Sequence, residues 1–432
     1  MTASATPAPS TGSLGRNYHK LWSSSAVSNL ADGVFIVALP LIAVRLTDSP
    51  MLIAGVSLAG RLPWLVFVLF AGALADRLDR RATMRNVQVM RVAVVGLMAA
   101  MALTDTLALP VLYVAAFALG VGETLFDTAA QSIMPSIVSK DLLSRANGRL
   151  YAVELIMNTF VGPPLGGFLV ALSVPLALGG SALCYGFAAV GLALIVGSFK
   201  PVPEGPRQSM LRDIREGFEF LWRVRVLRVM AIMVAISNLT STAYISVFVL
   251  FVVAPGPMGL DEVGYGLLFT TFAVGGLVGS LLEERVEARI GRSAVLFMGM
   301  ASGVLTLIPV VTAQPFVIAA GMVAMGAGGM MWNIITVSLR QRITPDHLLG
   351  RLNATYRLFA WGVMPIGALL GGLVAEFLGL RAMFLLSSVV MLATLYFLRY
   401  LRDADLAAAE TAAERAEVAS VPAVEPAEAD PA

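Results

Sequence analysis

The chain has 432 residues, of which 58% are hydrophobic and 13% are charged, and its mean hydropathy is +0.82. Soluble globular proteins are usually about half apolar, so this composition excludes a water-soluble globule. Two histidines and one cysteine are too few for a Cys/His metal cluster or an intrachain disulfide, and a formal net charge of +2 gives no general attraction to nucleic acid. We therefore expect no metal, no cofactor and no nucleic-acid partner.

Twelve apolar stretches are long enough to cross a membrane, because about 20 helical residues span a hydrocarbon core about 30 Å thick. We expect spans at 23–46, 51–75, 87–104, 109–133, 148–172, 175–199, 228–253, 263–282, 293–312, 315–338, 354–376 and 381–400. An even number of spans places both termini on the same side. Residues 1–20 lack the apolar core of a cleavable signal, so the first span is expected to act as an uncleaved insertion signal.

The basic residues indicate the orientation of these spans. Lys and Arg gather at both ends of the chain, in the connection between spans 6 and 7, and after spans 2, 4, 8 and 10. The opposite connections carry only Arg45 and Arg381, while Arg61, Arg91 and Arg357 lie within spans. The positive-inside rule therefore predicts cytoplasmic termini and a multi-pass protein of the inner (plasma) membrane. High usage of Ala, Arg and Gly favours a bacterial source.

The chain also repeats itself at a nearly constant offset. Residues 28–32 match 237–241, residues 141–147 match 347–353, and residues 162–167 match 367–372. Parallel repeats of this kind are typical of transporters. We expect an all-α membrane protein with two parallel six-helix repeats, divided into a tail (1–22), a first bundle (23–199), an amphipathic connection (200–227), a second bundle (228–402) and a disordered acidic tail (403–432).

The connection and the acidic tail allow more than one interpretation. In the connection, apolar residues recur at helical spacing with Arg and Glu between them: Met210, Leu211, Ile214, Phe218, Leu221 and Trp222. This segment lies along the membrane surface with its basic face toward anionic lipid, or it packs on the inner end of the bundle. The tail shows no apolar periodicity beyond a short helix at 404–418.

A motif between spans 2 and 3 resembles a known family signature. It reads Gly72-Ala73-Leu74-Ala75-Asp76-Arg77-Leu78-Asp79-Arg80-Arg81. This resembles the Gly-x-x-x-Asp-Arg-x-Gly-Arg-Arg/Lys signature of the major facilitator superfamily, with Asp79 in place of the second glycine. That variant is similar to the branch of drug:proton antiporters that includes macrolide efflux pumps and the enterobactin exporter. The resemblance covers the whole chain, including Ser28, Asn29 and Asp32 in span 1.

The resemblance implies roles for two groups of residues. Gly72, Asp76, Arg77, Arg80 and Arg81 would latch the cytoplasmic side closed by contacting the start of span 11. The alternative is that the arginines only set the topology. In span 5, Gly162, Pro163, Pro164, Gly166 and Gly167 would seal the seam between the halves, and the alternative is packing alone.

Four carboxylates fall at membrane depth, where ionisable groups are costly and therefore candidates for function. They are Asp32, Glu123, Asp127 and Glu154. Glu123 and Asp127 are four residues apart and share a helix face. Because spans 1, 4, 7 and 10 line the cavity in the superfamily fold, the resemblance implies that these acids face water and carry the coupling proton. The alternatives are permanent ion pairs with Arg61 or Arg91, or direct recognition of a cationic substrate.

The second half carries neutral counterparts, since the repeat maps Asp127 to Asn333 and Asp32 to Ser241. We expect substrate contacts from spans 7 and 10, made by Asn238, Thr242, Tyr244, Met331, Trp332, Asn333 and Thr336. The alternative for each of these residues is helix packing.

These features predict a secondary active transporter and not an enzyme. The chain has no phosphate-binding Gly-x-x-x-x-Gly-Lys-Ser/Thr loop and no nucleophile constellation within its spans. We expect it to export amphiphilic small molecules (a drug, antibiotic or siderophore) by alternating access with proton antiport. The alternative is a flippase for lysophospholipids or similar lipids, with or without proton coupling. Its expected partners are the substrate, protons and the bilayer, and we expect a monomer.

Overall fold

The computed structural model describes residues 14–66, 78–197, 199 and 210–420. Within this part of the chain the protein is helical, apart from an isolated bridge between Val253 and Leu260. Among the described residues, eleven helices are long and apolar enough to cross a membrane, and a shorter apolar helix, Pro50–Val66, occupies the place of the predicted span 2. The prediction of an all-α membrane protein is confirmed.

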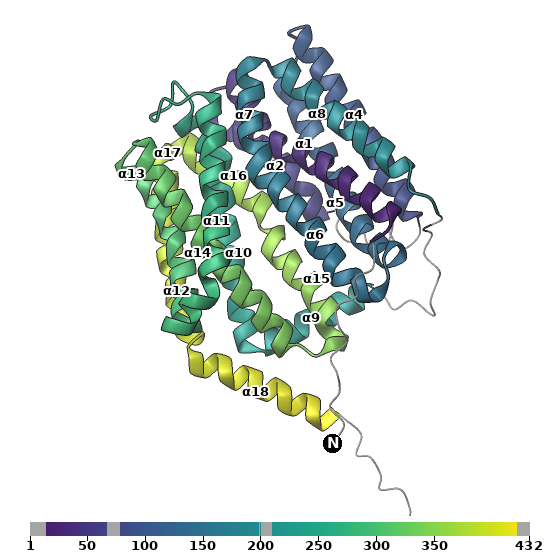
Figure 1. Ribbon diagram of the computed structural model, residues 1–432. Coiled ribbons are helices and arrows are strands. Elements are labelled where there is room, and N and C mark those ends of the chain that lie inside the picture. The colour runs from purple at the N-terminus through teal and green to yellow at the C-terminus, as the bar shows by residue number, and fades with distance from the viewer. Residues whose placement is uncertain (1–13, 67–77, 198, 200–209, 421–432) are drawn as a thin grey trace, which may run out of the picture.

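The described residues of the first half form eight helical elements and one short turn (Figure 1). They are α1 (Arg16–Leu46), α2 (Pro50–Val66), α4 (Arg80–Leu103), α5 (Leu109–Ile137), η1 (Lys140–Leu142), α6 (Leu143–Leu155), η2 (Ile156–Val161), α7 (Gly162–Leu172) and α8 (Val174–Ala193). Predicted span 5 is thus built from α6, a π-helical turn at η2, and α7. The predicted end of span 2, at 67–75, lies outside the described residues.

The second half begins with a short amphipathic helix. Its elements are α9 (Met210–Arg223), α10 (Arg225–Val252), α11 (Glu262–Ile290), α12 (Arg292–Ser302), η3 (Gly303–Leu307), α13 (Ile308–Val311), α14 (Pro315–Ile343), α15 (Asp346–Gly362), α16 (Met364–Leu378), α17 (Leu380–Thr394), η4 (Leu395–Tyr400) and α18 (Asp403–Ser420). Span 11 is formed by α15 and α16, which meet at Val363.

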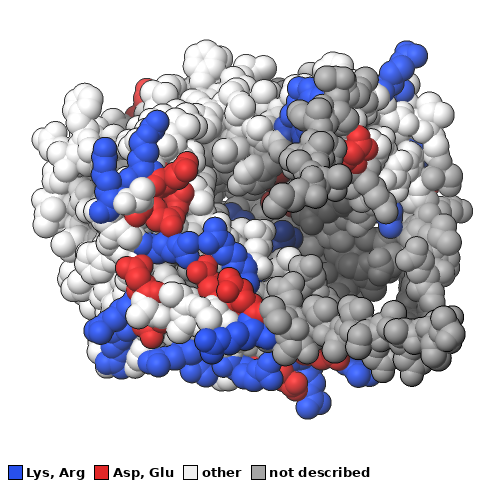
Figure 2. Space-filling view, turned by 60° about the horizontal axis from the view of Figure 1, so that its bottom comes forward, with Lys and Arg blue, Asp and Glu red and all other residues white. Residues whose placement is uncertain are grey.

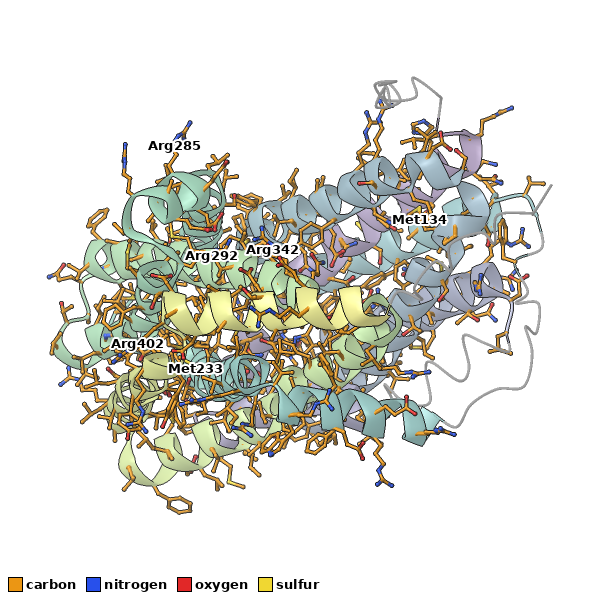
Figure 3. All side chains as sticks on the ribbon, turned by 90° about the horizontal axis from the view of Figure 1, so that it is seen from below. Met134, Met233, Arg285, Arg292, Arg342 and Arg402 are labelled. Atoms are coloured by element: carbon orange, nitrogen blue, oxygen red, sulfur yellow. The ribbon has the colours of Figure 1, made fainter. Side chains whose placement is uncertain are left out.

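The apolar cores show how the two halves meet. One core contains residues of both halves, such as Leu41 and Ile53 together with Phe248 and Phe384. It lies toward the end of the bundle that carries residues 47–49, here called the 47–49 end. Two further cores are each confined to one half, and Met134 and Met233 from these cores lie apart in Figure 3. The halves therefore share apolar packing at the 47–49 end and separate toward the opposite end.

Figure 2 shows that this opposite end is hollowed near its middle, with Lys and Arg atoms at the hollow. At the 47–49 end, polar contacts join the halves. Arg45 at the end of α1 pairs with Glu262 at the start of α11 at 2.6 Å. Ser49 donates a hydrogen bond of 2.7 Å to Glu376 near the end of α16. The bundle is thus fastened at one end and open at the other.

The amphipathic helix α9 packs on the bundle. Phe218 stacks on Phe359 of α15 with ring centroids 5.8 Å apart, and Gly217 lies directly against the α15 backbone at Arg351. Glu216 forms an ion pair with Arg351. The opposite face carries Arg215, whose side chain is 80% exposed. For the apolar face of α9, these contacts support packing on the bundle and not burial in the membrane surface.

The acidic tail differs from the expected disorder over residues 403–420, which form α18. Asp403 accepts a hydrogen bond from the backbone N–H of Ser293, and Leu406 is fully buried. Glu410 pairs with Arg292 at 2.9 Å and with Arg342 at 3.5 Å, and both arginines lie beside α18 in Figure 3. Disorder was expected from the acidic composition of the tail alone. Composition cannot show that Arg292 of α12 and Arg342 of α14 lie close enough to pair with the tail. Residues 421–432 lie outside the described part.

Candidate functional site

A cavity of about 420 Å³ lies between the halves and is lined mainly by the first half. The second half contributes Thr242, Ile245, Tyr265 and Phe269 from α10 and α11. The polar groups of the first half come from six different elements: Asp32, Arg61, Arg91, Glu123, Asn158 and Tyr185. The wall thus combines carboxylates, guanidinium groups and aromatic rings. Such a mixture suits an amphiphilic ligand.

Asp32 is held by an ion pair from the neighbouring helix α4. Arg91 Nη1 lies 3.2 Å from Asp32 Oδ2, and the Tyr185 hydroxyl donates a 2.7 Å hydrogen bond to Asp32 Oδ1. Arg91 is 2% exposed and also donates to Ser28 Oγ at 3.1 Å. Gln88 Nε2 donates to the same Ser28 oxygen at 2.8 Å. Burying an ion pair is costly unless its remaining polar groups are bonded. These contacts supply part of those bonds, while Arg91 Nε and Gln88 Oε1 are buried with no hydrogen-bond partner among the described residues.

Aromatic rings complete the surroundings of Arg91. The guanidinium carbon lies 5.2 Å from the ring centroid of Tyr185 and 5.7 Å from that of Phe126. For Asp32, the structure therefore contains the alternative named above, an ion pair with Arg91. About a quarter of the Asp32 side chain (27%) remains exposed, on the cavity side.

Glu123 lies on the same cavity without such a partner. Among the described residues, no Lys or Arg nitrogen lies within 4.0 Å of its carboxylate, and Arg61 lines the cavity without an ion pair of its own. Asp127 lies one helical turn further along α5 and is half-buried, and Glu154 of α6 is exposed. Neither of these two lines the cavity. The structure thus brings two of the four predicted acids, Asp32 and Glu123, to one wall.

A π-helical turn at η2 shapes the wall where span 5 passes α1. Gly33 of α1 has no side chain, and a Cβ there would lie 2.8 Å from the carbonyl oxygen of Asn158. Asn158 lines the cavity, and its Oδ1 atom is buried with no hydrogen-bond partner among the described residues. Single π-helical turns frequently occur at functional sites. The turn thus brings the Asn158 side chain to the same cavity wall as Asp32.

The seven predicted substrate contacts of the second half fall in different places. Thr242 lines the cavity. Tyr244 faces the shared core instead, with ring centroids 4.8 Å from Phe248 and 5.0 Å from Phe384. Asn238 donates to the Ala360 carbonyl at 2.7 Å.

The four candidates on α14 lie away from the cavity. Met331, Trp332 and Thr336 are buried in the second-half core, and Thr336 donates to the Trp332 carbonyl at 2.8 Å. Asn333 is exposed and does not line the cavity. Spacing along a helix identifies residues that share a face, but the direction of that face depends on tertiary packing.

Residue-level reasoning missed Tyr185, Tyr265 and Phe269. For the two tyrosines the available signal was a hydroxyl group in an otherwise apolar span, because a buried tyrosine O–H usually needs a partner. Tyr185 finds that partner in Asp32. Tyr265 and Phe269 are four residues apart on α11 and pack edge-to-face with centroids 5.2 Å apart.

Only part of the predicted gating motif is described, since Gly72, Asp76 and Arg77 lie outside the described residues. Arg81 donates to the carbonyl of Ile195, just beyond the end of α8, and the Arg80 backbone N–H donates to the Phe199 carbonyl at 3.4 Å. Both contacts stay within the first half.

Asp79, the departure from the family pattern, caps α4. Its carboxylate accepts from the backbone N–H of Ala82 at 2.9 Å and from that of Phe199 at 3.0 Å. Burial acts to raise the pKa of Asp79, but these two hydrogen bonds and nearby Arg81 outweigh it and hold the pKa below its ordinary value. Asp79 therefore joins the start of span 3 to the end of span 6.

The span 5 motif lies at the seam between the halves. Gly167 of α7 lies against the Glu262 carbonyl of α11, and a Cβ at Gly266 of α11 would lie 2.5 Å from the Pro163 carbonyl. Such contacts let two helix backbones approach closely. The related sequence in α16 lies against α2, where a Cβ at Gly372 would lie 3.0 Å from the Cα of Met51.

These features define a helical membrane transporter with a polar cavity between two halves. The profile of the family described as transmembrane secretion effectors matches residues 13–425, and the chain belongs to this family of the major facilitator superfamily. It is 28% identical over 411 residues to the multidrug efflux pump Tap of Mycolicibacterium fortuitum, covering 89% of this chain and 96% of that protein. It is 21% identical to macrolide efflux protein A of Streptococcus pyogenes, covering 87% and 93% of the two chains.

Among solved structures, the nucleoside transporter NupG superposes with a TM-score of 0.69 at 12% identity, covering 90% of this chain and all of that one. This likeness supports the fold alone. Because its relatives are transporters, the protein is a transporter and not an enzyme.

Proposed function

We propose that the protein is a proton-coupled exporter of amphiphilic small molecules such as drugs, antibiotics or siderophores. The named activities of its relatives, multidrug and macrolide efflux, support export as the direction of transport and support this class of substrate. The mixed polar and aromatic cavity supports an amphiphilic ligand. In this proposal the protein is a monomer in the cell membrane with both termini in the cytoplasm.

Alternating access is supported by the unequal contacts at the two ends of the bundle. The shared core and the Arg45–Glu262 pair close the 47–49 end, while the cores toward the opposite end are separate. With cytoplasmic termini, this arrangement is an inward-open state that admits substrate from the cytoplasm. Rocking of the halves about the seam at Gly167 and Gly372 would expose the same cavity to the outside.

The observation that carries proton coupling is the position of Glu123. It lies on the cavity wall with no ion pair within 4.0 Å among the described residues, whereas Asp32 is already held by Arg91. A carboxylate in this place can take up a proton when the cavity faces outward and release it when the cavity faces inward. Asp127, one turn away, is the second candidate for the relay, and Asp32 and Glu154 follow.

The test is gradient-driven transport by purified protein in proteoliposomes. We expect Glu123→Gln to abolish the acceleration that an imposed pH gradient gives, while downhill substrate exchange continues. Asp127→Asn should weaken the acceleration. Asp105→Asn is the matched control, because Asp105 is an exposed acid in the turn after α4. Undiminished acceleration in Glu123→Gln would remove this residue from proton coupling.

A further inference from the structure

Two tryptophans from opposite halves meet beside the cavity. Trp64 of α2 and Trp361 of α15 have ring centroids 4.8 Å apart and planes at 86°. The adjoining Gly362 lies so close to Leu65 that a Cβ there would come within 3.2 Å of the leucine side chain. The Trp64 Nε1 atom is buried near the Glu123 carboxylate and makes no hydrogen bond of normal geometry among the described residues. The pair is thus a contact between the halves next to an acid of the cavity wall.

An arginine lies on each side of this pair along the bundle axis. Arg61 precedes Trp64 by three residues, so it lies about 4.5 Å nearer the 47–49 end, on the cavity wall. Arg357 precedes Trp361 by four residues on a helix that runs the opposite way. It therefore lies about 6 Å nearer the open end. The order from the opening inward is Arg357, the tryptophan pair, Arg61.

Neither guanidinium group is neutralised in the way that Arg91 is. Both side chains are exposed, and no described carboxylate lies within 4.0 Å of either one. The Arg357 guanidinium carbon lies 5.4 Å from the Trp361 ring centroid, and Arg340 nearby stacks on Tyr356 at 4.1 Å. Glu123 shares the cavity wall with Arg61.

Charges within membrane spans mark ligand paths when no protein group compensates them. A guanidinium group binds carboxylate, phosphate or sulfonate through paired N–H donors, and tryptophan offers a large apolar ring face. The positive-inside rule does not account for Arg61 and Arg357, because both lie inside spans and not in the cytoplasmic connections. Their arrangement matches a ligand that has an aromatic ring system and one anionic group.

We propose that Arg357 and then Arg61 receive the anionic group of the substrate while Trp361 and Trp64 receive its rings, so that the exporter selects ring-bearing anionic or zwitterionic amphiphiles. This inference rests on the proposed export function and adds the charge class of the cargo. The rings of the substrate pass the tryptophan pair on their way from the opening to the cavity. Arg357 is the first contact and Arg61 the second.

Two fluorescent probes that differ in one charged group test the proposal in proteoliposomes. 8-Anilinonaphthalene-1-sulfonate is anionic, and N-phenyl-1-naphthylamine has the same rings without the sulfonate. We expect Arg357→Gln and Arg61→Gln each to lower transport of the sulfonate about tenfold, because a charge-assisted contact is lost, and to change transport of the neutral probe less than about twofold. Arg357→Lys, which keeps the charge, should retain an intermediate rate. Trp361→Ala should lower transport of both probes.

Arg399→Gln is the matched control. Arg399 also lies over aromatic rings, 3.7 Å from the Tyr396 centroid and 4.4 Å from that of Tyr400, but it is at the far end of η4. It should leave both probes unaffected. Equal losses for the two probes in Arg357→Gln and Arg61→Gln would overturn the inference in favour of a packing role. A wild type that moves only the neutral probe would overturn the inference while leaving export intact, and one that moves neither probe would count against both.

Discussion

Arg91 and Asp32 form a buried ion pair between α4 and α1, with Nη1 and Oδ2 3.2 Å apart. Because Arg91 is 2% exposed, its charge depends on Asp32 for compensation. The Asp32 carboxylate is therefore already neutralised by Arg91, without binding a proton. This distinguishes it from Glu123, although both line the same cavity.

Asp32→Asn should destabilise the protein by about 3–5 kcal/mol, because it leaves a buried guanidinium group without a counter-charge. The measurement is thermal unfolding of the purified protein in detergent. The double variant Asp32→Asn with Arg91→Gln should recover part of the loss, since both charges are then absent. Strictly additive losses would show that the two side chains are not coupled.

The Arg45–Glu262 pair should bias the protein toward closure at the 47–49 end. Arg45 is 42% exposed, so the pair contributes only about 0.2–1 kcal/mol, which is at most about a fivefold shift in population. We expect Arg45→Gln to speed labelling of Ile245→Cys by an impermeant maleimide from outside, in a Cys184→Ser background. Arg381→Gln offers a control on the same predicted side. No change in labelling would mean that the shared apolar core alone keeps this end closed.

Much of the fold could be predicted from the sequence, because membrane thickness fixes the length of an apolar helix. The predicted spans 4, 6 and 10 begin within about one residue of Leu109, Val174 and Pro315. The local pattern indicated a short helix at 404–418, close to α18, but not that this helix packs on the bundle. The helix is held by Glu410 and its partner Arg292, which are far apart in sequence.

The candidate site was predictable in its residue types more than in its geometry. Intramembrane acids stood out because charge is rare in the spans, and two of them line the cavity. The choice between Arg61 and Arg91 as the partner of Asp32 depends on how α2 and α4 are rotated. Tyr244 shows the same limit, since one polar atom cannot indicate that its ring packs on Phe384.

Gly167 should tolerate no side chain, because α7 lies directly against the Glu262 carbonyl there. We expect Gly167→Ala to cost about 1–3 kcal/mol through forced separation of the helices and to slow transport. Gly96→Ala is the control, because nothing lies within 4 Å of a Cβ at that position of α4. Thermal unfolding and transport rate should both separate the two variants. An unaltered Gly167→Ala protein would contradict the close approach at the seam.

Asp79 makes the stability of the first half depend on pH. Its carboxylate caps α4 and bonds the Phe199 N–H, so Asp79→Ala should cost about 0.5–2 kcal/mol at neutral pH. Because the pKa of Asp79 in the folded protein is lower than in the unfolded chain, its contribution is full above the unfolded value of about 4. It is lost as the pH falls through the folded value. Unfolding curves of the wild type and Asp79→Ala should therefore converge in acid, and a stability difference that does not shrink below pH of about 4 would mean that the cap does not depend on the ionised carboxylate.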